Sequence, residues 1–255
     1  MRLLTQEWKK LIGSGQTIAL FITVVAVGVV LTFFDGVPIL GEPESPLDVQ
    51  RVTNLYTGTI VVASIFPAIL GALSVTSEFR LGTAIATFLQ TPNRTRVLFA
   101  KMLIAGVGGA ISGALSMLAA YATAFVIVSR ASSAAAPDVA TLIGTVLGVV
   151  TTGFALGMFG AAVGALIRAQ IASLAVVIGW LVFIDNALSG ILGSAGIVLP
   201  YQLASFALSA PGDGTYFSQI IRDGTTAFVG LIGVFAWAVI IGLIASVTTL
   251  RKDID

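Results

Sequence analysis

Cysteine and histidine are both absent from this chain, and charged residues make up only 10% of its 255 positions. Without cysteine there is no disulfide and no thiol chemistry, and without histidine the commonest general base and a common metal ligand are missing. The sequence also lacks the G-x-x-x-x-G-K-[ST], G-x-S-x-G and H-E-x-x-H patterns. We therefore expect no catalytic residue, metal or cofactor on this chain.

Apolar residues take the place of the missing charges. They form 57% of the sequence, and the mean hydropathy is +1.04, whereas soluble domains carry about 25% charged residues. A helix needs roughly 20 apolar residues to cross the hydrocarbon. Seven intervals contain no Asp, Glu, Lys or Arg, and all but the fifth are long enough on their own: 11–34, 52–77, 102–129, 139–167, 169–184, 186–212 and 224–250. The sequence predicts a single all-α polytopic membrane domain over residues 1–255.

The charge-free intervals predict six transmembrane helices. Their expected positions are 17–34, 55–77, within 97–128, 142–167, 171–188 and 226–249. Before them, residues 1–16 place Leu4, Trp8 and Leu11 on one helical face beside basic residues, which predicts an interfacial helix. The polar stretch 35–54 is expected to be an extramembrane loop. The net charge of +1 and the scattered basic residues give no reason to expect nucleic-acid binding.

Glycines spaced four residues apart recur in the third and fourth expected spans. Such spacing lets helix backbones approach closely, so it predicts tight packing of the bundle and identifies no substrate. The pairs are Gly109–Gly113, Gly144–Gly148, Gly153–Gly157 and Gly160–Gly164.

Residues 187–210 are apolar but interrupted by glycines and Pro200, so they form either a seventh span or short re-entrant helices. The distribution of basic residues favours the second alternative. With six spans and an inward N-terminus, ten of the 13 basic residues lie inside, and the exceptions are Arg51, Arg130 and Arg222. A seventh span would move Arg251 and Lys252 outside, against the positive-inside rule. We expect both termini to be cytoplasmic and 187–210 to be an external re-entrant hairpin.

A charged segment, Glu78–Lys101, separates the second and third expected spans and holds four of the 13 basic residues. Within it, apolar residues at helical spacing predict a short amphipathic helix over 81–89, ended by Pro92 and Asn93. Such a helix between two spans suits docking on a soluble partner. If Glu78 is partly buried, we expect it to have a basic partner from the docked protein or from the N-terminal helix.

The order E-F-R-x-G-T, then P-x-R-x-R, then K-x-L in this segment resembles the permease subunits of ABC-2 type ATP-binding cassette exporters. The six-span layout, the N-terminal interfacial helix and the interrupted segment before the last span are similar as well. The resemblance implies two copies or close paralogues and two cytoplasmic ATPase subunits, which would hold the ATP and Mg²⁺. It also implies a bacterial plasma membrane and a coupling segment over 78–96. It assigns docking or coupling to Glu78, Arg80, Leu81, Gly82, Thr83, Ile85, Phe88, Leu89, Arg94, Arg96 and Lys101.

Asp185 and Asn186, near the end of the fifth expected span, are a second candidate site. Ionisable groups inside spans are costly and are often functional. Asp185 is either an interfacial acid with local hydrogen bonds or a polar feature of the cargo path. Two other functions stay open: an ion-gradient-driven secondary transporter, which would depend on Asp185, and a membrane scaffold without transport. For a transporter, the scarcity of buried charge favours hydrophobic or amphipathic cargo, such as drugs, antimicrobial peptides or lipids.

Overall fold

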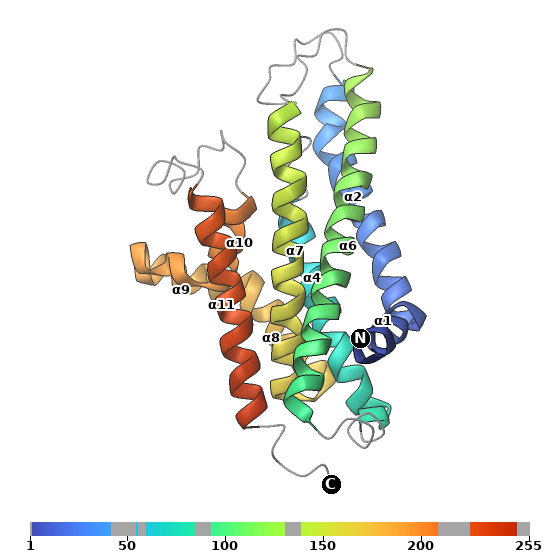
Figure 1. Cartoon of the computed structure of the whole chain (residues 1–255). Helices are drawn as coiled ribbons and strands as arrows, with labels where there is room; N and C mark the ends of the chain where they lie inside the picture. Colours follow the sequence, from blue (N-terminus) through green and yellow to red (C-terminus); the bar gives the residue numbers. More distant parts are fainter. Residues whose placement is uncertain are drawn as a thin grey trace.

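The computed structural model describes residues 2–41, 55, 60–84, 93–130, 139–208 and 225–248, and these residues form helices and turns without a β-strand. The expected all-α fold is therefore confirmed for this part of the chain (Figure 1). The helices are α1 (Arg2–Gly13), α2 (Gly15–Gly41), α4 (Ile60–Arg80), α6 (Arg94–Val128), α7 (Val139–Ile167), α8 (Gln170–Gly179), a π-helix (Trp180–Ile184), α9 (Asp185–Leu192), a 3₁₀-helix (Gly193–Val198), α10 (Pro200–Leu208) and α11 (Thr225–Val247).

Five segments are long and apolar enough to cross a membrane, judged by length and composition. They are Gly15–Gly41, Arg94–Val128, Ile143–Ile167, Gln170–Val198 and Phe228–Val247. The expected second span corresponds to α4, whose 21 residues would extend about 31 Å along the helix axis. The chain thus has the composition and helix lengths of an all-α polytopic membrane protein.

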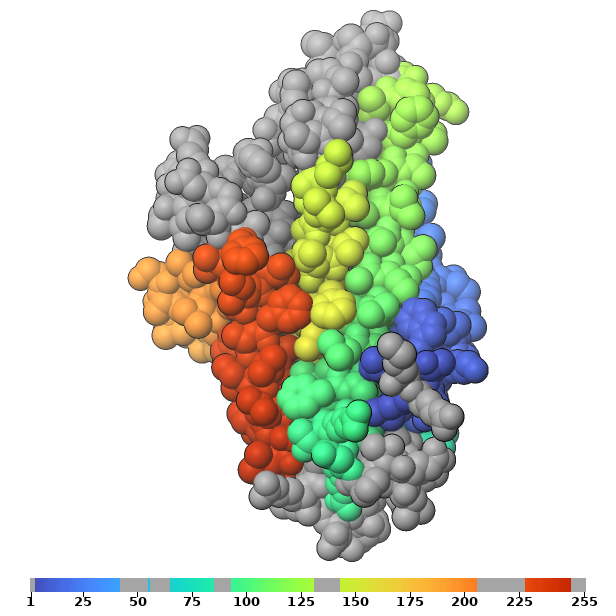
Figure 2. All heavy atoms as spheres, viewed as in Figure 1, coloured from blue at the N-terminus to red at the C-terminus, as the bar shows by residue number. Residues whose placement is uncertain are grey.

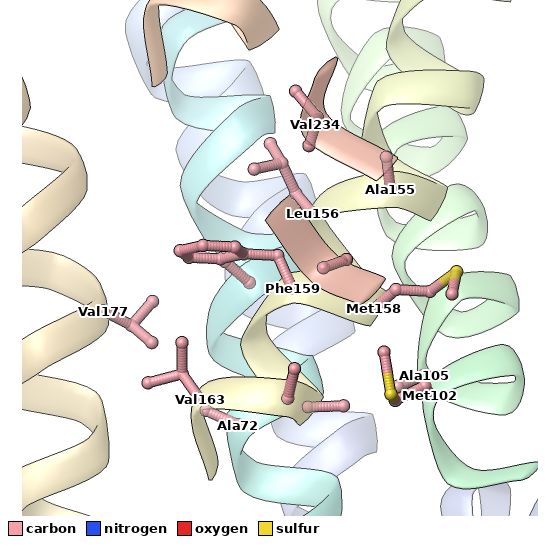
Figure 3. Close-up of a cluster of buried hydrophobic side chains, with 14 of the residues drawn as sticks. Ala72, Met102, Ala105, Ala155, Leu156, Met158, Phe159, Val163, Val177 and Val234 are labelled. Atoms are coloured by element: carbon pink, nitrogen blue, oxygen red, sulfur yellow. The ribbon is translucent and has the colours of Figure 1, made fainter. Parts of the chain in front are cut away.

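Helix α7 lies at the centre of the bundle. It packs against α4, α6 and α11, while α1 and α2 cover α6, and α10 lies against α11. Side chains from α4, α6, α8, α10 and α11 meet around Leu156 and Phe159 of α7, both of which are almost completely buried (Figure 3). From Thr152 to Ala165 nearly every residue of α7 is buried, and the helix is correspondingly apolar around its circumference.

Two glycines allow α6 and α7 to touch backbone to backbone. A methyl group on Gly109 would overlap the carbonyl oxygen of Gly153, and one on Gly153 would overlap the carbonyl oxygen of Gly109. The predicted role of Gly109 and of Gly153–Gly157 in close packing is therefore confirmed. For Gly144 the prediction is wrong, because this glycine is exposed and its added methyl would meet no atom within 4 Å.

The chain stays helical further than the sequence predicts after the first span. Helix α2 runs through Asp35 and Pro38 to Gly41, although 35–54 was expected to be a loop. The reason is packing, since Gly36 is buried against Ile127 of α6 and holds the last turns of α2 in place. The remainder of the expected loop, 42–54, lies outside the described residues.

The expected fifth span, 171–188, is not one uninterrupted α-helix. It consists of α8, the π-helix and the first residues of α9, and the backbone N–H of Asp185 bonds to the carbonyl oxygen of Trp180 five residues earlier. The segment that follows is broken into short helices, as expected. Figure 1 shows α9 running sideways from the bundle, and Figure 2 shows it projecting beyond α11. The external, re-entrant placement of 187–210 stays a prediction.

Candidate functional site: an ionic ring beside the coupling segment

Three elements meet at one end of the bundle: the N-terminal helix α1, the last turn of α4 and the first turns of α6 (Figure 1). Helix α1 is amphipathic as predicted, with Leu11 buried, Trp8 partly buried and Leu4 at the exposed edge of the same face. Glu7 also lies on this apolar face, three residues after Leu4 and four before Leu11. A carboxylate on a buried helix face requires a partner, and the neighbouring helices supply it.

Glu7, Lys10, Glu78 and Lys101 form a closed ring of alternating charges. Lys101 Nζ lies 2.5 Å from Glu7 Oε2 and 2.6 Å from Glu78 Oε1. Lys10 Nζ completes the ring at 2.8 Å from Glu7 Oε1 and 3.0 Å from Glu78 Oε1. Each lysine thus bridges both glutamates, so the four charges cancel and tie α1 to α4 and α6.

Three members of the ring are largely buried, and the fourth is partly exposed. The side chains of Glu7, Lys101 and Glu78 are 4%, 7% and 12% exposed, whereas Lys10 is 44% exposed. Burial opposes ionisation of Glu7, but Lys101 and Lys10 outweigh it and hold the pKa of this carboxyl below its ordinary value. For Lys10, burial favours the neutral amine, but the hydrogen bonds to Glu7 and Glu78 raise its pKa. These shifts hold the Glu7 carboxylate and the Lys10 ammonium in their charged forms near neutral pH.

A small cavity of about 60 Å³ borders the ring between α1, α2, α4 and α6. Its walls combine the four charged side chains with Ser14, Thr17, Ser74 and apolar residues. The cavity has room and polar partners for water, which lowers the cost of keeping charges at this depth.

The coupling segment begins directly after the ring. Helix α4 ends because Gly82 adopts a left-handed conformation with φ of 69°, which favours glycine, and its N–H bonds to the carbonyl oxygen of Phe79. Leu81 and Gly82 therefore form a turn, and the expected amphipathic helix does not start at Leu81; the chain becomes helical again at Thr83. The rest of that predicted helix, with Ile85, Phe88 and Leu89, lies outside the described residues.

At the other end of the coupling segment, Asn93 begins the next helix. Its side-chain oxygen accepts a hydrogen bond from the backbone N–H of Arg96 at 3.1 Å, which caps α6. Asn93 was expected to help end the preceding helix. In the structure it initiates α6, a role that was not predicted. Around the segment, Leu81 is 65% exposed, and Arg80 and Arg96 are exposed as well.

Arg168 adds a further cation at this end, in the turn between α7 and α8. Its backbone is left-handed, with φ of 62°, and its guanidinium carbon lies 5.5 Å from the ring centre of Phe79. In the described part of the chain its Nε and Nη2 have no acceptor. Burial and the nearby Arg94 lower its pKa from the ordinary arginine value. Arg168 therefore lies at the same end of the molecule as the exposed Arg80 and Arg96.

Asp185 lies elsewhere, between α9 and α10. It is completely buried, and its Oδ2 accepts a hydrogen bond of 2.9 Å from the backbone N–H of Tyr201, at the start of α10. The indole of Trp180 lies near the same carboxylate without forming a hydrogen bond of ordinary geometry. A carboxylate at a helix N-terminus is favourable, so Asp185 stabilises the junction of α9 and α10.

Asn186 joins the same two helices by a second route. Its amide nitrogen donates to the carbonyl oxygen of Val182 at 3.0 Å, and its amide oxygen accepts from Gln202 at 3.4 Å. Both Asp185 and Asn186 therefore have contacts that shape the interrupted segment. Their contact with cargo stays a prediction.

The structure brings some predicted site residues together and separates others. Glu78 and Lys101 share the ionic ring, and Lys10 of α1 fulfils the expectation of a basic partner from the N-terminal helix. Asp185 and Asn186 belong to a different part of the bundle. Glu7 is the one member of the ring that was neither predicted as a site residue nor placed in a basic group, although its position on the same helical face as Leu4 and Leu11 is a signal that could have identified it.

Comparison with known proteins adds no family to these observations. A scan of the sequence against protein-family models finds no match, and a search of curated proteins finds no significant relative. Within the described residues, no group of three or more histidine, cysteine, aspartate or glutamate side chains is placed to hold a metal ion.

Proposed function

We propose that this chain is the permease subunit of an ABC-2 type ATP-binding cassette exporter that moves a hydrophobic or amphipathic cargo out of the cytoplasm or inner leaflet. In this proposal α4, the expected second span, also crosses the membrane and brings the number of spans to six. Two permease chains pair in a bacterial plasma membrane, and two cytoplasmic ATPase subunits dock on the coupling segment. ATP hydrolysis occurs on those partners, and both termini of this chain are cytoplasmic.

The ionic ring is the observation that supports the proposal most. Within the coupling segment, α4 ends at Arg80, two residues after Glu78, and α6 begins at Arg94, seven residues before Lys101. The ring ties these two helices to each other and to α1. A displacement of the coupling segment would therefore move three helices together, as a stiff element must do if ATPase closure is to bias the membrane domain.

The exposed residues around the segment support a docking surface. Leu81, Arg80 and Arg96 point away from the core and have no role in its packing. An exposed leucine between basic residues suits a partner groove with an apolar floor and acidic rim. We expect the ATPase subunits to have such a groove.

The first experiment is purification through a tag on this chain after expression with its neighbouring genes. A co-eluting ATPase with a Walker motif that hydrolyses ATP would support the proposal. The variant pair R80A and L81S is then expected to lower transport per ATP hydrolysed while the chain still inserts and folds. Purification of the chain without any ATPase from gentle detergent would contradict the proposal.

The alternative function, ion-gradient-driven transport, would depend on Asp185, because this acid is completely buried. A variant at this position therefore tests the alternative. We expect the D185N variant to fold, because asparagine can still accept the hydrogen bond from Tyr201. If the chain is an exporter, transport by this variant should be independent of the proton gradient. Loss of gradient-dependent transport in this variant, with the fold preserved, would support the secondary transporter instead.

A further inference from the structure

A large apolar groove lies between α2 and α6, far from the ionic ring. Its volume is about 560 Å³, and it is lined by Val25, Val29, Phe33, Leu40, Ala119, Ala122, Thr123, Val126, Ile127 and Arg130. Thr123 brings a hydroxyl group to the groove, but this hydroxyl already donates a hydrogen bond of 2.9 Å to the carbonyl oxygen of Ala119. Among the lining residues that the structure describes, Arg130 is the one with a charged side chain, and it is exposed.

The dimensions of the groove match one leaflet of a bilayer. From Ala119 to Arg130 it extends about 17 Å along α6, and half of the hydrocarbon thickness is about 15 Å. Lys101, in the ionic ring, and Arg130 are about 44 Å apart along the axis of α6, close to the full bilayer thickness including both headgroup layers. With the ring at one headgroup layer, Arg130 therefore lies at the headgroup layer of the opposite leaflet.

We propose that this groove binds one anionic phospholipid, with an acyl chain along Val29, Phe33 and Val126 and the phosphate at Arg130. Both helices belong to the segments that are long and apolar enough to span a membrane, so lipid is the medium that surrounds them. The apolar wall accepts the chain of any lipid. Arg130 distinguishes headgroups, because a guanidinium binds phosphate with two parallel hydrogen bonds and favours a net negative charge.

The lipid has a structural consequence at the α2–α6 contact. Side chains of this contact that face the groove, such as Val29 and Phe33, are 40% and 49% exposed, while Gly36 and Ile127 are in direct contact. An acyl chain in the groove completes the packing of the outer half of α2. This inference concerns a bound lipid distinct from the cargo and does not depend on the proposed exporter function.

Native mass spectrometry of the full chain, released from nanodiscs containing equal amounts of phosphatidylglycerol and phosphatidylcholine, tests the proposal. We expect one retained phosphatidylglycerol and a preference of about fivefold over phosphatidylcholine, as one basic residue near the headgroups provides. R130Q should remove the preference. The matched control R96Q, an exposed arginine at the other end of α6, should keep it.

A second variant tests the groove itself. A122W places a large side chain in the groove and leaves Arg130 intact, so the retained lipid should be lost. Because the chain contains no cysteine, F33C provides a single reporter for the competing occupant, a second copy of the chain. Equal retention of both lipids by the wild type, unchanged retention in A122W, or efficient F33C disulfide dimers in membranes would each overturn the proposal.

Discussion

The two ends of α6 hold a cation in opposite surroundings. Lys101 is 7% exposed and contacts two glutamates from two other helices, whereas Arg130 is exposed at the end of an apolar groove. Removing a cation from a closed buried network leaves charges without compensation, while removing an exposed one leaves water or a ligand in its place. One end therefore joins three helices through an ionic network, and the other ends at the mouth of an apolar groove.

The largest effect is expected from K101M. This variant leaves Glu7 and Glu78 buried near each other with Lys10 as the remaining cation of the ring, so the free energy of unfolding should fall by about 3–5 kcal/mol. Denaturant titration in detergent micelles, followed by circular dichroism, measures the change. The control R96M, on the exposed face of the same helix, should stay within about 0.5 kcal/mol of the wild type. Equal losses in both variants would remove the difference between the ring and the exposed surface.

A second effect should arise between the two ends, where α6 touches α7. G109A forces a methyl group onto the carbonyl oxygen of Gly153, which should cost about 1–3 kcal/mol and separate the helices. G144A meets no atom and should be neutral or stabilising by up to about 1 kcal/mol, because alanine favours helix more than glycine does. The pair of melting temperatures in one detergent checks this prediction. If G109A were as stable as the wild type, α6 and α7 could separate at Gly109 and Gly153 without a loss of folding free energy, contrary to this prediction.

The acid dependence of stability should depend on the ring. The pKa of Glu7 lies below its ordinary value of 4.5, so its contribution is complete above pH 4.5 and is lost as the pH falls through the lower value in the folded protein. The stability difference between the wild type and E7Q should therefore be constant from neutral pH to about 5 and shrink in more acidic buffer. Unfolding midpoints measured in a pH series test this. A difference that widens with acidity would contradict the lowered pKa.

At alkaline pH the contribution of the ring to stability should be lost as the pH rises, opposite to the acid range. The pKa of Lys10 lies above its ordinary value of 10.5, so its stabilising contribution is present below pH 10.5 and is lost as the pH rises through the higher folded value. K10M should reduce stability at neutral pH by less than K101M does, since Lys10 is nearly half exposed. Unfolding midpoints of both variants at pH 8 provide the comparison, and a larger loss in K10M would reverse this ranking.

The smallest effect on stability is expected from R130Q. Arg130 is exposed, so unfolding of the lipid-free protein in detergent should change by no more than about 0.5 kcal/mol. The same micelle titration measures it. A loss comparable to that of K101M would show that Arg130 has a structural partner and would end the contrast between the two ends of α6.

Helix positions could be predicted from the sequence with few errors. The expected third, fourth and last spans correspond to α6, α7 and α11, because uninterrupted apolar runs and flanking charges are local signals. The errors fall where a distant contact overrides a local signal. Helix α2 continues through Asp35 and Pro38 because Gly36 packs on α6, and the fifth span is interrupted by a π-helix that precedes a buried aspartate.

The site could be predicted in part. Glu78 and Lys101 were identified as members of one charged segment, and a basic partner from the N-terminal helix was one of two stated alternatives for Glu78. Glu7 was missed, because its importance depends on Lys101, which lies 94 positions further along the chain. Asp185 is predicted from the sequence as an ionisable group of a span, either an interfacial acid or a polar feature of the cargo path. Its complete burial and its partner Tyr201 follow from the fold of α9 and α10.

By itself the sequence determined that this protein is helical, rich in segments long and apolar enough to span a membrane, and without cysteine and histidine. These properties depend on composition and on the lengths of local apolar runs, so no knowledge of distant contacts is needed. The tertiary structure decided which charges compensate one another and where a groove remains between helices. Both depend on how side chains from α1, α2, α4 and α6 meet, and such contacts join residues that the chain itself keeps far apart.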